Sequence, residues 1–288
     1  MPTPTVRRLQ LGNELRHLRE RTGLTLEEAG KAIERSQAVM SRLEHGVTGL
    51  RQRDLRALVE FYQERVIDND AVDVEWYLSL NKGADQRGQW SGYRTAYAKY
   101  FRMAVDLEAD ASTINWYEVE IIPGLLQTEE YVRTLFTEAG ARNAPESMIQ
   151  ARLERRHVLT AERPPCVTFV LSQSCVERMA GSPEVMQGQI QHLLDVSERD
   201  NINLHVLSFR SGMASDARYP FTHYVIPAIG NAPPLEFGFV EPYEGGQYLD
   251  DLDSLTRYKQ LWSRLLGAAL DTARTRDYLM SAKKSYSE

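Results

Sequence analysis

The pattern of apolar positions predicts two short helices between residues 24 and 46. Thr25 precedes the first run as an N-cap residue, and Glu28 follows three positions later as its capping-box partner. Ser36 begins the second run in the same way, and Gly46 follows its last periodic residue. The apolar positions at helical spacing are Leu26, Ala29 and Ile33 in the first run and Val39, Met40 and Leu43 in the second.

The second of these helices has a small, polar and basic outward face. Helix-turn-helix proteins place such residues against base edges, where Gln37 would pair with adenine and Arg42 with guanine. An ordinary helical hairpin with a solvated face shows the same pattern, so both interpretations stay open. The predicted DNA-contacting set is Ser36, Gln37, Ala38, Ser41, Arg42, the preceding Arg35, and Arg19 at a phosphate.

The same stretch resembles the repressor-type helix-turn-helix family, which includes the phage lambda repressor and the xenobiotic-response-element (XRE) regulators. The matching residues are Gly23-Leu24-Thr25, Glu27-Glu28, Gly30, Ser36 and Ser41-Arg42-Leu43-Glu44-His45-Gly46. By matching position, Gln37, Ala38 and Arg42 fall where this family reads bases. Two positions depart from the pattern: Leu26 stands where the family often has a phosphate-contacting Gln, and Glu34 stands where the turn has Gly, which suggests a slightly different turn.

The remaining pattern predicts two domains. A helix over 9–21 and one or two helices over 51–63 complete a five-helix, lambda-repressor-like DNA-binding domain at residues 1–66. The following stretch is acidic at 68–73, can continue as helix over 74–80 and is polar over 81–89, so we interpret residues 67–89 as a linker. Residues 90–288 form the C-terminal regulatory or partner-binding domain.

The C-terminal domain begins with an aromatic helix predicted over 90–109, followed by a strand over 113–122. An aromatic stripe at helical spacing is more often core than a ligand site. If this domain takes a small molecule, the predicted lining residues are Tyr93, Tyr97, Tyr100 and Trp116.

Beyond this point the chain is predicted to be a mixed α/β body around a small sheet, within a mainly helical protein. Thr128 caps a helix, and the arginines of the next one form a solvated or salt-bridged face. The further predicted elements are helices over 145–160 and 183–197, strands over 166–171, 202–209, 221–226 and 235–240, and one long C-terminal helix over 250–279.

A second resemblance covers this body. The aromatic helix, the strand and the phrase Ile122-Pro123-Gly124-Leu125-Leu126-Gln127-Thr128, with Tyr131 after it, are similar to the C-terminal domain of the actinobacterial WhiJ-like regulators. The function of that domain is poorly defined in the family. The resemblance implies developmental or antibiotic-linked regulation, often beside a small partner protein in an antitoxin-like arrangement.

Composition and charge agree with a DNA-binding regulator. The 288-residue chain is 42% hydrophobic and 26% charged, with a net charge of −6. Residues 1–65 hold twelve Lys and Arg against nine Asp and Glu, an excess of three positive charges, so the remainder carries −9. A mildly basic DNA-binding domain joined to an acidic C-terminal domain suits sequence-specific binding. No apolar run has the length of a membrane span and the first residues lack a signal-peptide core, so we expect a cytoplasmic protein.

Motifs for catalysis or metal binding are missing from the sequence. It contains no phosphate-cradling Gly loop, HExxH, CxxC or Gly-x-Ser-x-Gly, and its six histidines are scattered. We interpret Cys166 and Cys175 as two small core side chains; a redox pair would require the fold to bring them together. We therefore expect no enzyme activity, no metal and no cofactor.

The sequence thus predicts a transcriptional regulator that resembles the repressor-type XRE family, with activation and repression both open. We expect a homodimer on near-palindromic double-stranded DNA, with a C-terminal domain that senses a small-molecule effector or a protein. The alternative is an antitoxin-like protein that chiefly binds a small partner protein and regulates its own operon.

Overall fold

The chain divides into two compact units, each described here by itself. Unit 1 comprises residues 1–91 together with 226–235, and unit 2 comprises the rest of the chain. The computed structural model describes four ranges of the chain: 5–66, 72–84, 97–141 and 145–287.

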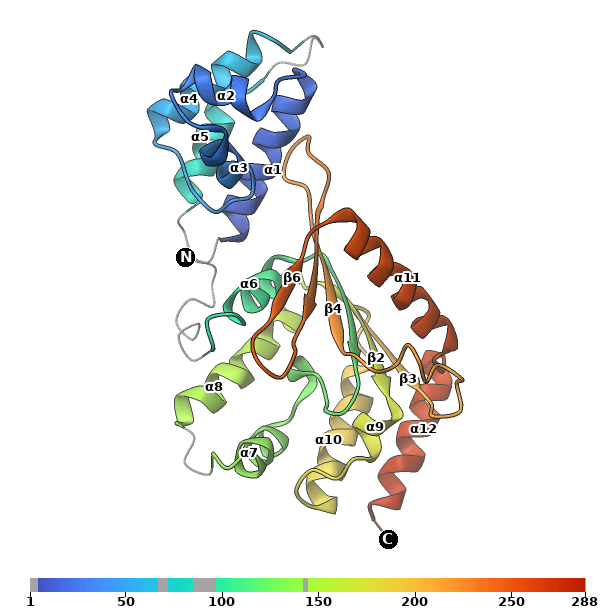
Figure 1. The fold of residues 1–288 in the computed structure, drawn as a ribbon. Helices are drawn as coiled ribbons and strands as arrows, with labels where there is room; N and C mark the ends of the chain where they lie inside the picture. The colour runs from blue at the N-terminus through green and yellow to red at the C-terminus, as the bar shows by residue number, and fades with distance from the viewer. Residues whose placement is uncertain (1–4, 67–71, 85–96, 142–144, 288) are drawn as a thin grey trace. The chain divides into compact units, whose positions relative to one another are not determined.

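The described part of unit 1 is a bundle of five helices (Figure 1): α1 (Val6–Arg21), α2 (Leu26–Ala32), α3 (Gln37–Glu44), α4 (Gln52–Gln63) and α5 (Val74–Gly83). Its core is apolar, and Leu15, Met40 and Leu55 are fully buried in it. Tyr77 and Leu78 of α5 belong to the same core. The helical unit therefore extends beyond residue 66, and the predicted linker over 67–89 contains one of its helices.

Local sequence signals position α2 and α3 as predicted. The Thr25 hydroxyl accepts from the backbone N–H of Glu28 at 3.2 Å, and the Glu28 carboxylate accepts from the Thr25 N–H at 2.8 Å. A Cβ atom on Gly30 would lie 2.5 Å from the carbonyl oxygen of Arg35. The turn can therefore approach α2 closely only because residue 30 has no side chain.

Glu34 occupies the turn position at which the repressor family has Gly. Its φ angle is 55°, and it is the one described non-glycine residue with a positive φ. Because Cβ crowds the backbone in this left-handed region, the conformation costs about 1–2 kcal/mol. The departure from the family pattern thus leaves a strained residue between α2 and α3.

Residues 226–235 join unit 1 from far along the chain. The Glu14 carboxylate of α1 accepts from the backbone N–H groups of Asn231 and Ala232 at 3.2 Å, and the Asn13 amide donates to the Pro233 carbonyl at 2.8 Å. Glu14 is 2% exposed. Its buried charge is therefore satisfied by backbone donors that lie more than two hundred residues away in sequence.

Unit 2 is an α/β structure around a mixed six-stranded sheet in the described residues, with strand order β3-β2-β1-β4-β5-β6. Strands β1, β2 and β3 are parallel to one another, β4 is antiparallel to β1, and β6 is antiparallel to β5. The strands are β1 (Thr113–Glu118), β2 (Cys166–Ser172), β3 (Ile202–Leu207), β4 (Phe221–Ile226), β5 (Leu235–Val240) and β6 (Gln247–Leu249).

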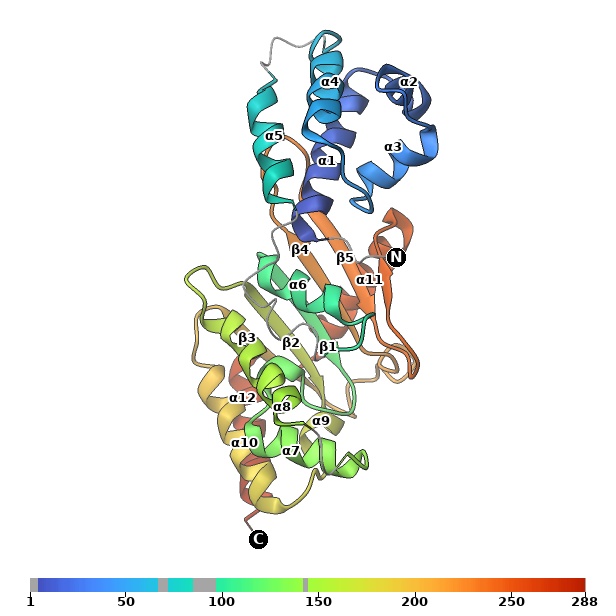
Figure 2. The same cartoon turned by 90° about the vertical axis from the view of Figure 1, so that its left-hand side faces the viewer.

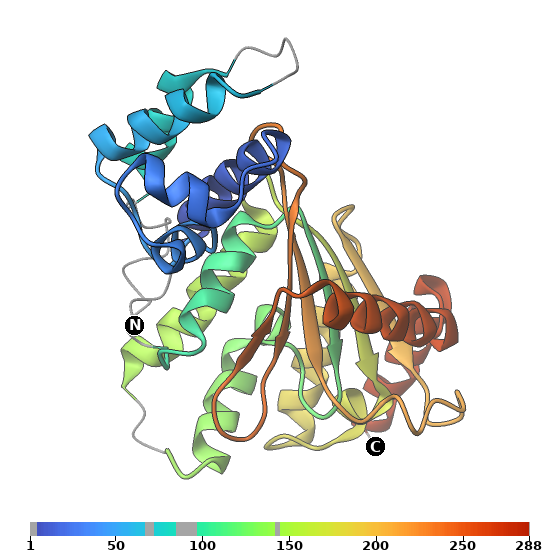
Figure 3. The ribbon, with the colours of Figure 1, turned by 45° about the horizontal axis from the view of Figure 1, so that its top comes forward.

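Helices pack on both faces of this sheet (Figures 1 and 3). Tyr117 of β1 packs against Trp262 and Leu265 of α11, whereas the neighbouring Trp116 lies on the opposite face, beside Phe101 and Arg155. Helices α10 and α12 lie side by side (Figure 2). The helices are α6 (Arg102–Asp110), α7 (Glu129–Glu138), α8 (Glu146–Glu154), α9 (Gln173–Glu177), α10 (Pro183–Val196), α11 (Leu252–Ala268) and α12 (Thr272–Ser285), with 3-10 helices η2 (Gly124–Leu126) and η3 (Arg155–Thr160).

Two predicted helices differ from the structure. The prediction of one helix over 250–279 is wrong: α11 ends at Ala268, and Asp271 caps α12 by accepting from the Arg274 N–H. Between them the Leu270 N–H donates to the Val206 carbonyl of β3 at 2.8 Å, a contact that an unbroken helix would forbid. In the aromatic segment, the described helix begins only at Arg102.

Replacing Glu34 by Gly should stabilise unit 1. Relief of the left-handed strain exceeds the added entropy of the unfolded chain, so we expect a gain of about 0.5–1 kcal/mol in the free energy of unfolding. Hydrogen exchange of the α2 and α3 amides in urea would measure it. Glu34→Ala is the matched control because it removes the side chain and keeps the strain. An equal gain in both variants would contradict the backbone explanation.

Candidate nucleic-acid interface and ligand cavity

The predicted reader residues lie on the outer face of α3. Met40 and Leu43 are buried against the core, and Ser41 is half-buried. Ser36 precedes α3 as predicted, although its hydroxyl makes no cap hydrogen bond. The exposed members of the predicted set are Arg35, Ser36, Gln37, Ala38 and Arg42. The fold thus presents this face to a ligand, and the DNA contacts themselves stay predictions.

Arg19 has a different setting. Its guanidinium makes a two-pronged ion pair with Glu44, at 2.7 and 2.9 Å, and also donates to the Leu24 carbonyl at 2.8 Å. The side chains of Arg19 and Glu44 are 11% and 3% exposed. The hydrogen bonds that Arg19 donates to the Glu44 carboxylate raise the pKa of Arg19. This geometry favours a structural role, tying α1 to the end of α3, over the predicted phosphate contact.

Arg51 and Arg53, which lie outside the predicted DNA-contacting set, stand near the start of α3. Arg35 pairs with Asp54 at 2.9 Å, which places the first turn of α4 beside the N-terminus of α3. Arg51 and Arg53 lie at this turn and are exposed; the side chain of Arg53 is 95% exposed. Cationic side chains at a helix N-terminus are typical of phosphate-binding positions. The signal in the sequence is the pair of arginines at the predicted helix start.

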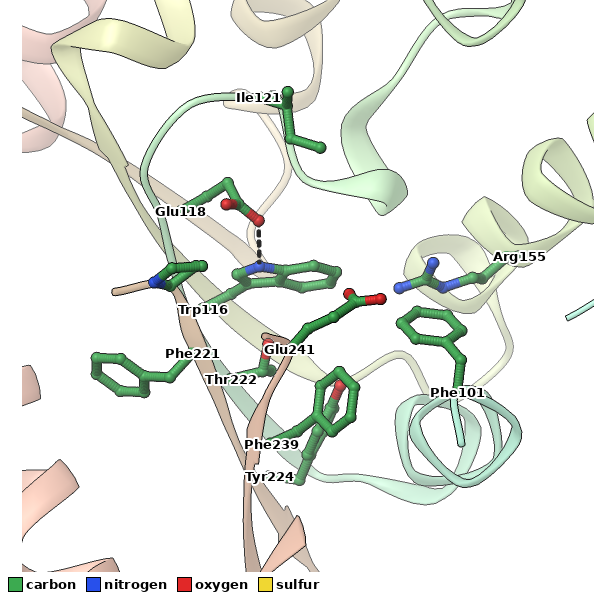
Figure 4. Close-up of a pocket in the computed structure, with 11 residues that line it drawn as sticks. Phe101, Trp116, Glu118, Ile121, Arg155, Phe221, Thr222, Tyr224, Phe239 and Glu241 are labelled. Atoms are coloured by element: carbon green, nitrogen blue, oxygen red, sulfur yellow. Dashed lines mark hydrogen bonds between the residues drawn. The ribbon is translucent and has the colours of Figure 1, made fainter. Parts of the chain in front are cut away.

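Unit 2 contains a cavity of about 230 Å³ on the sheet face that bears Trp116 (Figure 4). Strands β1, β4 and β5 form its floor, with Trp116 opposite Thr222 in the β1–β4 register. Phe101 at the start of α6 and Arg155 of η3 close it from the helical side. Glu118 and Glu241 also line it. The cavity is therefore mostly aromatic, with a few charged groups.

Arg155 is held by a buried ion pair. Its Nε and Nη2 atoms donate to the two carboxylate oxygens of Glu108, both at 2.5 Å, and the two side chains are 4% and 1% exposed. The guanidinium carbon lies 4.8 Å from the ring centroid of Phe101 and 5.6 Å from that of Trp116. Burial opposes the charge, but the Glu108 carboxylate outweighs it and raises the pKa of Arg155. Arg155 thus stays protonated in the cavity wall, and the Glu108 carboxylate balances its charge.

The Pro-Gly-Leu-Leu-Gln-Thr phrase builds the turn beside this arginine. A Cβ atom on Gly124 would lie 2.9 Å from Nη1 of Arg155, so only glycine leaves room for the guanidinium. Gln189 of α10 fixes the turn from the other side, accepting from the Thr128 N–H at 2.8 Å and donating to the Leu126 carbonyl at 2.7 Å. The motif at residues 123–128 therefore has a packing role next to the cavity.

Glu118 is the unusual group of the cavity. It accepts only from neutral donors, the Trp116 indole N–H at 3.3 Å and the Val119 N–H at 3.1 Å. Burial raises its pKa to about 7, and the charge of Glu241 adds to this shift, while the two hydrogen bonds oppose it. Among the residues that the structure describes, no cation lies within ion-pair distance of Glu118 or Glu241.

The four aromatic residues predicted to line a ligand site have different outcomes. Trp116 lines the cavity. Tyr97 donates its hydroxyl to the Ala151 carbonyl and Tyr100 donates to Glu241, but neither lines the cavity wall. Tyr93 lies outside the described residues. Phe101 also lines the cavity and lies at the end of the aromatic segment that the sequence predicted as the ligand region. The missed residues Glu118, Arg155 and Phe239 come from separate elements, although the two-residue spacing of Trp116 and Glu118 on one strand places them on one face.

Other candidate chemistry is limited in the described residues. No group of three His, Cys, Asp or Glu side chains there is arranged to hold a metal ion. Both cysteines are free; Cys175 is buried as predicted, but Cys166 is exposed, so the core interpretation is wrong for Cys166. Within the described ranges no helix is long and apolar enough to cross a bilayer.

The frame of α1 to α4, with an exposed α3 face, defines a helix-turn-helix protein, a class of DNA-binding regulators. Residues 10–65 match the model of a helix-turn-helix domain. Residues 101–281 match the model of a domain of unknown function, DUF5753, and the chain belongs to that family. No curated protein matches the chain, and no solved structure does.

Removing the Arg19 side chain should destabilise unit 1 by about 3 kcal/mol, because it leaves the buried Glu44 carboxylate without its cation. Urea unfolding of the full chain, followed by hydrogen exchange in α1 and α3, measures the change. Arg16→Ala is the control: Arg16 forms an exposed ion pair with Glu20, and its loss should change stability by less than about 1 kcal/mol. Unchanged stability in Arg19→Ala, with weaker binding to every DNA sequence, would restore the phosphate role.

Glu118 should make the stability of unit 2 depend on pH. The folded pKa of about 7 lies above the usual glutamate value of 4.5, so the neutral carboxyl contributes its full stability below pH 4.5. That contribution should fall as the pH rises to about 7 and then stay constant. Between pH 4.5 and pH 7, we expect the unfolding free energy of the wild type, measured relative to Glu118→Gln, to fall by about 2–3 kcal/mol. Hydrogen exchange of the β1 amides measures it, and a pH-independent difference would refute the raised pKa.

Proposed function

We propose that the protein is a sequence-specific DNA-binding transcriptional regulator whose α3 helix reads base edges in the major groove. The observation that carries this proposal is the exposed face of α3 on a frame held by the Arg19–Glu44 pair. In this role Gln37 and Arg42 make direct base contacts, and Ser36, Ala38 and Ser41 line the same surface.

Phosphate contacts in this proposal come from the arginines beside the reader. Arg51 and Arg53 sit at the first turn of α4, where the helix N-terminus also favours an anion. Arg35 reaches a phosphate only by leaving Asp54. The excess of three positive charges in residues 1–65 agrees with DNA binding by this part of the chain.

The finer parts of the proposal follow from the class and from the resemblance to WhiJ-like regulators. A single reader helix covers one half-site, so we propose a homodimer that represses from a near-palindromic operator, in the manner of XRE regulators. The ligand is chromosomal DNA, so the proposed location is the cytoplasm. The proposed role is binding, without catalysis.

Unit 2 is proposed to sense a small molecule in its aromatic cavity. The cavity is concave, has aromatic walls and carries few charged groups, which are common properties of small-molecule sites. This observation favours a small-molecule effector over the alternative of a small partner protein bound in an antitoxin-like complex.

Operator binding tests the DNA-reading proposal. A duplex selected from a random library by the full chain serves as operator, and a scrambled duplex serves as competitor. Gln37→Ala and Arg42→Ala should each weaken operator binding by about 1–3 kcal/mol, whereas Arg53→Ala should weaken both duplexes equally and reduce the salt slope by about one. Arg65→Ala, at the far end of α4, is the matched control and should bind normally.

Two results would overturn the proposal. Unchanged operator affinity in both reader variants, with folding intact, would mean that α3 does not read bases. Failure to select any preferred duplex would remove sequence-specific binding altogether. The symmetry of the footprint on the selected operator, with the molecular mass of the bound protein, tests the homodimer.

A further inference from the structure

The charged groups of the unit 2 cavity do not balance one another. Arg155 brings one positive charge, but Glu108 neutralises it through both carboxylate oxygens. Glu118 and Glu241 add two carboxylates without a cation at ion-pair distance in the described chain; Arg152 acts on Glu241 only at longer range. The cavity as a whole is therefore negative once these carboxyl groups ionise.

The two carboxylates belong to one binding space. Figure 4 shows the Glu118 carboxyl group at the indole N–H of Trp116 and the Glu241 carboxyl group on the side of the ring that faces Arg155, and both residues line the cavity. Glu118 is bonded to the indole N–H, and Glu241 accepts only from the Tyr100 hydroxyl at 3.0 Å. Each carboxylate keeps acceptor capacity for a further donor, since an ionised carboxylate accepts up to about four hydrogen bonds.

The walls and the size of the cavity limit the rest of the ligand. Trp116, Phe239 and Phe101 provide flat apolar surfaces, and the indole ring gives the strongest attraction to a nearby cation. A volume of about 230 Å³ holds about eight waters, which is room for one small ring system. An anionic ligand would face two carboxylates, and a neutral one would leave them unpaired in a partly buried site.

We propose that this cavity binds a protonated amine carried on a flat apolar ring, with the ring against Trp116 and the ammonium group paired with Glu118 and Glu241. The assignment deepens the sensing role proposed above and rests on it for its biological meaning, but the binding site stands on its own geometry. Ionisation of Glu118 is part of binding, so the amine site strengthens as the pH rises toward 8.

Calorimetric titration of the full chain with two matched sets of probes tests the site. One set is tryptamine, 3-methylindole and indole-3-propionate; the other is 2-phenylethylamine, 2-phenylethanol and 3-phenylpropionate. At pH 8 we expect the amine in at least one set to bind about tenfold or more tighter than its neutral and anionic counterparts. Its affinity should rise about tenfold between pH 6 and pH 8.

Variants assign the binding to the named groups. Glu118→Gln should lower amine affinity about tenfold, remove its pH dependence and leave the neutral probe unaffected. Glu241→Gln, at an exposed position that does not endanger folding, should lower amine affinity about threefold. The matched control is Glu244→Gln, an exposed carboxylate outside the cavity lining, which should bind as the wild type does.

The outcomes separate this inference from the regulatory proposal. Equal binding of neutral or anionic probes, amine binding untouched by both cavity variants, or no amine binding at all would overturn the amine site. Amine binding that leaves operator affinity unchanged would support the site and overturn the sensing role. Normal amine binding in a protein that selects no operator would overturn DNA reading alone.

Discussion

A buried guanidinium must keep its carboxylate, and this constraint organises both units of the protein. In unit 1, Arg19 and Glu44 join α1 to the end of α3. In unit 2, Arg155 and Glu108 join η3 to α6 and form one wall of the cavity. Separating either pair would leave a charge in a medium that solvates it poorly, so each pair holds its helices in one arrangement. Both candidate binding surfaces depend on these fixed helices.

The two buried ion pairs were not predictable from the sequence. Arg19 and Arg155 both appear in basic helical runs, which predicted a phosphate contact for one and a solvated or salt-bridged face for the other. Their partners lie 25 and 47 residues away, so the burial of each arginine is decided by tertiary packing. The capping box of Thr25 and Glu28, in contrast, depends on residues three apart and was predicted correctly. This short-range signal was reliable because its energetics are local, whereas the predicted N-cap Ser36 stands at the right position but makes no cap hydrogen bond.

The same distinction explains the remaining differences. The repeat of apolar residues over 250–279 continues through a break that β3 imposes by accepting from Leu270. Helix α5 falls in the stretch interpreted as linker, where residues 74–80 were expected to continue as helix, but its place in the unit 1 core depends on α4 and α1. Leu26, which replaces a phosphate-contacting Gln of the repressor family, packs against the unit 1 core. The cavity was only partly foreseen through Trp116, since its walls come from five separate elements.

The hydrogen bonds that Glu14 accepts make the helix-turn-helix unit depend on a distant part of the chain. Its backbone donors belong to residues 231 and 232, which are flanked in sequence by strands of the sheet. The DNA-binding unit is thus discontinuous in the gene. A recombination event that moved only the first 91 codons to another protein would transfer α3 without these donors. We therefore expect evolution to transfer the whole chain, so that the helix-turn-helix unit and the unit with the cavity are inherited together.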